Sequence, residues 1–354
     1  MAGARRGALA AVAACASCFA AARADPVADF YRGKQISMYI RAAPGGNYDV
    51  YSRVLGRHMT RHIPGNPLVV PINMPGGGGL VALSYVVNAA PRDGDALTII
   101  TQSFPMDQAL GLAKNRRVDM RALRWIGNMS DTNEFVFTAK SSPTRTLDDA
   151  RRRETVIAAT GVGSIMTQLA GVYNNLLGTR FRVVYGYPSG PEMSLAMERG
   201  EVEARSTSNP QVLGATKAEV LAKYNFLIQA GVRKIPDFSE TPLLRDLATS
   251  DRDRRVFDFI SKAAVIARPL VAGPATPPDR VQALRRAFDE TLVDPQFLAE
   301  AASLNLEIGA TSGEELQKLV FDLLDTPPEA LGEVAAAITL RDVTARPGGA
   351  RGEP

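Results

Sequence analysis

The stretch that decides the fold is ISMYI (residues 36–40), RAAPGG (41–46) and NYDVYSRVLGRHMTRH (47–62). The first segment is a short apolar run, which is typical of a buried strand. The second contains a proline and paired glycines, which interrupt regular structure. The third places Val50, Val54 and Met59 on one face, which predicts an amphipathic helix. Strand, glycine-rich loop and helix in this order predict one βα unit of an α/β protein.

The same alternation continues along the chain in both directions from this unit. Strands are expected at 68–71, 96–101, 135–139, 155–160, 182–185, 202–206, 264–267 and 304–308. Helices are expected at 80–88, 147–153, 165–177, 192–199 and 251–262, and a proline-rich loop at 268–278. Such alternation predicts mainly parallel sheets flanked by helices, and a length of 354 residues suggests two domains or one large one.

Composition excludes several classes of protein. Hydrophobic residues make up 45% and charged residues 22% of the chain, which is unlike a disordered or collagen-like protein. The formal charge is +4, but Arg5, Arg6 and Arg23 lie in the first 24 residues, which contain no acid. The remaining chain is close to neutral and lacks the charge excess of a nucleic-acid-binding protein. We therefore expect no nucleic-acid partner.

Residues 1–24 have the pattern of a secretory signal peptide. Two arginines precede an alanine-rich apolar stretch, and the segment ends in the small-residue site ARA, so cleavage is expected before Asp25. Both cysteines, Cys15 and Cys18, would be removed, which leaves no disulfide and no cysteine-bound metal. Two alternatives are a bacterial lipobox, VAAC, with Cys15 as the lipid anchor, and a frayed helix of a cytosolic protein. No segment has about 18 consecutive apolar residues, as a membrane helix would.

Glycine-rich loops recur between a strand and a helix at 44–48, 75–80 and 161–165, with a similar loop at 186–191. The start of a helix offers unpaired N–H groups and a partial positive charge, and glycine lets a ligand approach the backbone. In α/β proteins such loops lie together at the carboxyl ends of the strands. They predict a small anionic ligand, a carboxylate or a phosphate. The alternative for each single loop is a plain turn.

No catalytic or cofactor motif accompanies these loops. The run GVG at 161–163 lacks the third glycine and the distant acid of a dinucleotide site, and neither a P-loop nor a nucleophile elbow is present. His58 and His62 share a helix face but lack further metal ligands nearby, so a surface pair is the simpler interpretation. We therefore expect no cofactor, no metal and no catalytic residue, although an enzyme that uses neither His nor Cys is not excluded.

Asp49 has two possible roles. It lies in the expected first turn of a helix, where a carboxylate complements the helix dipole. It could instead accept a hydrogen bond from a hydroxyl, ammonium or water of the ligand. The sequence leaves both roles open.

The order and spacing of several motifs resemble a known family. The loop APGGNYD (43–49), the loop NMPGGGG (73–79), the turn APRDG (90–94) and the loops TGVGS (160–164) and GYPSG (186–190) are similar to those of Bug-type receptors. These are the solute-binding proteins of tripartite tricarboxylate transporters. The resemblance covers about residues 29–325. The chain departs from the family pattern at Asn47 and Arg205.

The resemblance implies a type II periplasmic-binding-protein fold in which two α/β lobes enclose a small carboxylate. It implies lobe 1 at 25–125 plus 250–340 and lobe 2 at 126–249. The tail at 341–354 is rich in glycine, proline and charged residues and is expected to be disordered. It also implies a periplasmic location and a membrane permease as partner, and we expect a monomer. A receptor without catalysis is the first hypothesis, and an exported or cytosolic α/β enzyme acting on a small anion is the second.

The expected ligand-binding residues lie in the loops of both lobes. They are Gly45, Gly46, Asn47, Tyr48, Asp49, Gln102, Ser103, Thr160, Gly163, Ser164, Ser189 and Arg205. Arg205 lies near the end of the expected strand at 202–206, where it could pair with a ligand carboxylate through two hydrogen bonds. Its alternative role is a solvated charge at the end of the strand.

Overall fold

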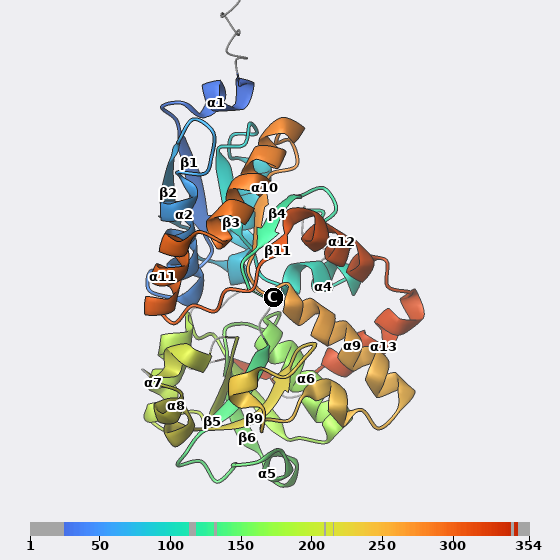
Figure 1. The fold of residues 1–354 in the computed structure, drawn as a ribbon. Coiled ribbons are helices and arrows are strands. Elements are labelled where there is room, and N and C mark those ends of the chain that lie inside the picture. Colours follow the sequence, from blue (N-terminus) through green and yellow to red (C-terminus); the bar gives the residue numbers. More distant parts are fainter. Residues whose placement is uncertain are drawn as a thin grey trace, which may run out of the picture.

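Two lobes, each built on a six-stranded sheet, make up the computed structural model (Figure 1). The structure describes residues 25–112, 118–130, 133–208, 210–214, 216–340 and 343–345. The expected signal peptide, with Cys15, lies outside these residues, as does most of the expected disordered tail.

The first sheet has the strand order β11-β4-β10-β3-β1-β2. Its strands are β1 (Gln35–Ile40), β2 (Leu68–Asn73), β3 (Ala96–Ile99), β4 (Arg124–Asn128), β10 (Pro269–Ala272) and β11 (Thr311–Ser312). β1 pairs in parallel with both β2 and β3, whereas β10 runs antiparallel between β3 and β4. The carboxyl ends of the parallel strands and the start of β10 therefore lie at the same edge of this sheet.

The second sheet has the order β12-β7-β6-β8-β5-β9. Its strands are β5 (Glu134–Ala139), β6 (Thr155–Ala159), β7 (Phe181–Tyr185), β8 (Ala204–Thr207), β9 (Tyr224–Ala230) and β12 (Val343–Ala345). β6 is parallel to β7 and β8, and β5 is antiparallel to β8 and β9. Each lobe is thus an α/β unit built on a mixed sheet, which agrees with the expected fold class. The expectation of mainly parallel sheets is wrong for the first lobe, where β10 pairs antiparallel with β3 and β4, and β11 pairs antiparallel with β4.

Helices flank both sheets. Those of the first lobe are α1 (Pro26–Tyr31), α2 (Asn47–Met59), α3 (Leu80–Asn88), α4 (Ser103–Ala109), α10 (Pro278–Leu292), α11 (Pro295–Ser303) and α12 (Gly313–Leu324). Those of the second lobe are α5 (Leu147–Arg152), α6 (Ile165–Leu177), α7 (Gly190–Glu198) and α8 (Lys217–Lys223). The remaining two, α9 (Asp251–Val265) and α13 (Pro328–Ile338), pack against each other at the junction of the lobes (Figure 1).

The chain crosses between the sheets three times. It leaves the first sheet after β4, returns through α9 to β10, and then enters the second sheet again at β12. The first crossing therefore follows Asn128 rather than residue 125. The last crossing was not expected: α13 packs on α6, and β12 pairs in parallel with β7, so residues 343–345 are a strand and not part of a disordered tail.

Two expected strands are wrong. Residues 264–267 include the end of α9, and the strand follows at Pro269–Ala272, inside the expected proline-rich loop. A proline can be the first residue of a strand, because its missing N–H then removes no essential ladder bond. Residues 304–308 follow α11 without forming a strand, and the next strand, β11, has only two residues.

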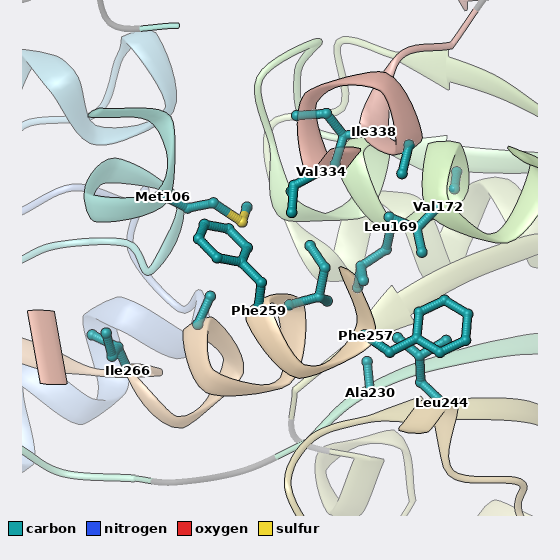
Figure 2. Packing of buried hydrophobic residues seen from close by; sticks show 14 of the residues in the cluster. Met106, Leu169, Val172, Ala230, Leu244, Phe257, Phe259, Ile266, Val334 and Ile338 are labelled. Atoms are coloured by element: carbon teal, nitrogen blue, oxygen red, sulfur yellow. The ribbon is translucent and has the colours of Figure 1, made fainter. Parts of the chain in front are cut away.

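A single apolar cluster joins the lobes. Met106 of α4 lies beside Phe259 of α9, and Leu169 of α6 lies close to Val334 and Ile338 of α13 (Figure 2). All of these side chains are buried in one cluster. Because this core belongs to both lobes, their relative position along α9 is maintained by apolar packing.

Candidate functional site

The glycine loops of both lobes lie where the two sheets approach each other. In the first lobe they follow β1 and β2, and in the second they follow β6 and β7. Arg268, at the start of β10, donates from Nη2 to the Ser208 hydroxyl after β8, at 3.0 Å. This hydrogen bond brings the carboxyl-end edges of the two sheets into contact.

Several backbone N–H groups of the loop after β1 are already hydrogen-bonded within the first lobe. Gly45, with a φ of +80°, donates its N–H to Asp49 Oδ2 at 2.9 Å, and Gly46 donates to the Ala43 carbonyl at 3.3 Å. Asp49 Oδ1 accepts from Arg53 and Asn73, each at 2.8 Å. Burial raises the pKa of Asp49, but these hydrogen bonds outweigh it and hold the pKa below its usual value. Asp49 therefore holds this loop in place.

Tyr48, in the first turn of α2, lies between two arginines. Its ring centroid is 4.2 Å from Arg41 Cζ and 5.0 Å from Arg268 Cζ. Arg41 donates from Nε to the Gly78 carbonyl at 3.2 Å, in the loop after β2. Arg268 is 1% exposed, and its Nε has no hydrogen-bond partner among the described residues. Burial lowers the pKa of Arg41, and Arg268 lowers it further, so two positive charges lie close together here.

The β3 loop reaches the junction with buried side chains. Gln102 and Ser103 are both buried at the start of α4, and the Ser103 hydroxyl lies 3.4 Å from Thr101 Oγ1. One turn further, Asp107 accepts a hydrogen bond of 2.7 Å from Gln168 of α6 in the other lobe. Asp107 therefore connects the lobes.

The loop after β6 is open. Thr160 and Gly163 are exposed, and no other atom lies within 4 Å of a methyl group placed on Gly163. Ser164 is the N-cap of α6, and its hydroxyl accepts from the Thr167 N–H at 3.4 Å. The loop places Ser164, as expected, at the start of a helix that contacts the other lobe.

The loop after β7 lies against Arg205. Ser189 is the N-cap residue of α7, but its hydroxyl makes no capping hydrogen bond. A methyl group on Gly190 would lie 2.9 Å from Arg205 Nη1, so the guanidinium lies at the start of this helix. Arg205 is 4% exposed, which rules out the alternative of a solvated strand-end charge.

One buried carboxyl group lies among these arginines. Glu134, the first residue of β5, accepts a 2.6 Å hydrogen bond from Ser206. Burial raises the pKa of Glu134 to about 7, although Ser206, Arg268 and Arg205 all act to lower it. Because a pKa of about 7 leaves this group only partly ionised at neutral pH, the junction carries a net positive charge.

The structure brings some of the expected ligand-binding residues together and adds others that were not expected. The loops lie at one junction, and Tyr48, Ser189 and Arg205 join the charged cluster there. Sequence reasoning missed Arg41, Arg268 and Glu134. The available signals were a charged residue directly after the first strand, and one directly before the strand at 135–139.

The remaining candidate groups are engaged elsewhere. His58 Nε2 lies 2.6 Å from Glu300, which joins α2 to α11. The expected shared helix face of the two histidines is wrong, because α2 ends at Met59 and His62 lies in the turn after it, where its Nε2 is 2.9 Å from Asp294. A surface recess lined by Ser142, Arg153 and other residues lies at the opposite edge of the second sheet, where Arg153 is paired with Glu203 at 2.6 Å. The part of the chain described here contains no helix long and apolar enough to cross a membrane.

Comparison with known proteins supports the resemblance seen in the loops. No protein-family model matches the chain. Protein BugT of Bordetella pertussis is 28% identical over 200 residues, which is 54% of this chain and 60% of that protein. The chain thus matches somewhat less than two thirds of the length of this relative.

Solved structures share the fold over nearly their whole length. The periplasmic binding protein BugD aligns with a TM-score of 0.68 and 18% identity, covering 87% of this chain and 99% of BugD. Rpa4515 of Rhodopseudomonas palustris, solved with adipate, gives 0.67 and 18%, covering 86% and 97%. MatC of the same organism, with bound malate, gives 0.66 and 18%, covering 85% and 99%. The chain is therefore a two-lobed protein of the periplasmic-binding fold that resembles the Bug-type receptors in sequence and in structure.

Proposed function

We propose that this protein is an extracytoplasmic solute receptor that binds a small carboxylate between its lobes. It delivers this ligand to a tripartite tricarboxylate-type membrane permease and catalyses no reaction. The observation that carries the proposal is the cluster of Arg41, Arg205 and Arg268 where the glycine loops of both lobes meet. Guanidinium groups bind carboxylates with charge-assisted hydrogen bonds, and the helix starts add further N–H donors.

The relatives support the same ligand class. The names of two structural neighbours include adipate and malate, which are both small dicarboxylates. The residues proposed to surround the ligand are the exposed loops at Thr160 and Gly163, the helix starts at Asn47, Ser164 and Ser189, and the arginines. We also propose that the receptor acts as a monomer.

A ligand screen tests the proposal. Adipate, malate, citrate, hexanoate and ATP are added separately to the purified protein, and its melting temperature is measured. A ligand that binds only the folded state at about 100 times its dissociation constant adds about 2.7 kcal/mol to the free energy of unfolding. We expect a dicarboxylate to raise the melting temperature, ATP to leave it unchanged, and the bound ligand to be recovered intact. Stabilisation by ATP alone, or conversion of the bound carboxylate, would favour the enzyme hypothesis.

Delivery to a permease requires export. We propose that residues 1–24 are a signal peptide and that the mature receptor is periplasmic. The mass of the chain isolated from its native host distinguishes a start at Asp25 from a lipidated start at Cys15. A chain that still begins at Met1 would contradict export.

A further inference from the structure

The last helix and strand of the chain are attached to the second lobe. α13 packs on α6 and also contacts α9. Asn175 of α6 donates from Nδ2 to the Ala337 and Thr339 carbonyls at the end of α13, at 2.8 Å each. β12 then pairs with β7 in the second sheet. Because this attachment combines sheet pairing, hydrogen bonds and close packing, α13 and β12 move with the second lobe.

The preceding helix, α12, is attached to the first lobe. Its N-cap residue, Ser312, belongs to β11, which pairs with β4 of the first sheet. α12 also packs on β4 and α4, and Arg285 of α10 donates from Nη2 to Gln317 Oε1 at 3.1 Å. α12 therefore moves with the first lobe.

The link between these two helices is short and stiff. It consists of three residues, Asp325, Thr326 and Pro327. Arg121 of the first lobe donates from Nη2 to Asp325 Oδ1 at 2.6 Å and so holds the start of the link. Pro327 and Pro328 fix their own φ angles and restrict the residue before each of them. Because an extended chain spans at most about 3.5 Å per residue, α12 and α13 cannot move far apart.

The link and α13, residues 325–338, form a C-terminal strap that joins the lobes at a second place. The first place is where β4 meets the end of α9, since Asn128 donates from Nδ2 to the Val265 carbonyl at 2.9 Å. The strap meets α9 earlier, where Arg255 donates to Glu333 through hydrogen bonds of 2.8 and 2.6 Å. Arg255 and Val265 are ten residues apart, which corresponds to about 15 Å along α9.

Two separate attachment points restrict how the lobes can move. Two bodies joined at one point can bend and twist, whereas bodies joined at two points can rotate only about the line between the points. Figure 1 shows α9 and α13 together at one side of the junction, with α7, α8 and α11 at the other. A twist of one lobe against the other would have to pull α12 away from α13.

We propose that the C-terminal strap is a second hinge point, which lets the lobes bend along α9 but prevents them from twisting against each other. The glycine loops of the two lobes then remain aligned when the lobes separate. This inference goes beyond the proposed receptor function, because it concerns the movement of the lobes and holds for any ligand.

Distances between two spin labels, measured without ligand, test the proposal. Cys15→Ala and Cys18→Ala leave the full chain without cysteine. Val293→Cys, between α10 and α11, and Leu195→Cys, on α7, then place one label at an exposed position of each lobe. Dipolar electron paramagnetic resonance gives the distribution of distances between the labels.

An insertion of Gly-Ser-Gly-Ser between Thr326 and Pro327 releases the strap and leaves the contacts of α13 in place. Such a flexible insert has a root-mean-square length of about 11 Å, so the distance distribution should become wider by several ångström. The same insert between Ser239 and Glu240, which are exposed residues within the second lobe, is the matched control and should leave the width unchanged. Equal widths in the two proteins would overturn the proposal and assign the alignment of the lobes to the apolar core alone.

A second variant keeps the test decisive if the protein with the lengthened strap does not fold. Pro327→Gly combined with Pro328→Ala retains the length of the link but removes its stiffness. The distribution should become wider, by less than with the insertion. Pro277→Gly combined with Pro278→Ala is the control, because these two prolines begin α10 with the same geometry but lie within the first lobe. An unchanged width in the folded Pro327 and Pro328 variant would also contradict a hinge point at the strap.

Adipate titration of the same proteins separates this proposal from the receptor function. If the wild type binds no adipate, the receptor function fails, while the distances still decide whether the strap is a hinge point. If it binds adipate, the lengthened strap should weaken binding by roughly 3- to 10-fold, because only a fraction of the molecules then has the loops of both lobes aligned. The control insertion should bind adipate as the wild type does.

Discussion

Asp49 and Arg205 are both buried and charged, but their surroundings differ in a way that separates structure from function. The Asp49 carboxylate accepts hydrogen bonds from Gly45, Arg53 and Asn73. Among the residues that the structure describes, Arg205 borders the Phe137 ring and the start of α7, and Glu134 interacts with it electrostatically. A charge that is fully paired within the chain stabilises the fold, whereas an unpaired one is available to a ligand. The sequence left both roles open for each residue, because partners distant in the chain decide between them.

Glu134 should make ligand binding depend on pH. A ligand carboxylate near Arg205 and Arg268 repels ionised Glu134 but not its protonated form, while Tyr173, which also faces it, stays neutral. Since the pKa of Glu134 is about 7, adipate affinity should fall as the pH rises from about 6 to 8. Glu134→Gln removes the ionisable group, so the affinity of this variant should stay nearly constant over the same range. Calorimetric titration at both ends of the range measures this difference.

The control for this prediction is Glu154→Gln. Glu154 is an exposed carboxylate that pairs with Arg182. This variant should retain the wild-type decrease in affinity. An equally steep decrease in Glu134→Gln would assign the pH dependence to another group.

At the scale of helices and strands, local sequence was a good guide wherever periodicity was strong. The helices at 80–88 and 165–177 have the expected bounds, because apolar spacing and the preceding glycine or serine indicate both their length and their start. β10 begins a few residues after the expected strand at 264–267, because its first residue is Pro269 and proline was interpreted as part of a loop. The crossing to α13 and β12 could not be predicted, since three strand residues near the end of the chain carry almost no periodic signal.

The close contact between α6 and α13 requires a residue without a side chain at position 171, which is Gly171. A methyl group at this position would lie 2.3 Å from the Ile338 carbonyl oxygen, and backbone cannot move aside cheaply. Gly171→Ala should therefore lower the melting temperature clearly, corresponding to about 1–3 kcal/mol of overpacking. Gly332→Ala, in α13, is the matched control because no other atom lies within 4 Å of the added methyl group. It should be neutral or slightly stabilising, since alanine favours a helix over glycine. Equal melting temperatures of the two variants would contradict the close packing of α13 on α6.

At the scale of the whole molecule, the candidate site is assembled from segments far apart in the chain. Arg205 lies within β8 of the second sheet, whereas Arg41 follows β1 and Arg268 precedes β10 of the first sheet, and the crossings of the chain bring them together. Glycine loops can be recognised in the sequence, because glycine and proline patterns are local signals. The role of an arginine in or next to a strand cannot be recognised in this way, since the same residue at the surface would look identical in the sequence. The loops could therefore be predicted, while most of the charged cluster required the tertiary structure.

The shared core predicts that the lobes unfold together. Trp125 is the only tryptophan of the chain, lies on β4 of the first lobe and belongs to the cluster that α9 carries into the second lobe. Its fluorescence therefore reports the first lobe, whereas far-ultraviolet circular dichroism reports both. We expect the two thermal transitions to coincide, as in a two-state protein. Phe259→Ala should lower the midpoints of both transitions together, corresponding to a loss of about 3–5 kcal/mol in the free energy of unfolding, because it removes a large side chain from the common core. A dichroism curve with two steps, only one of which is followed by Trp125, would show instead that each lobe has a core stable enough to fold alone.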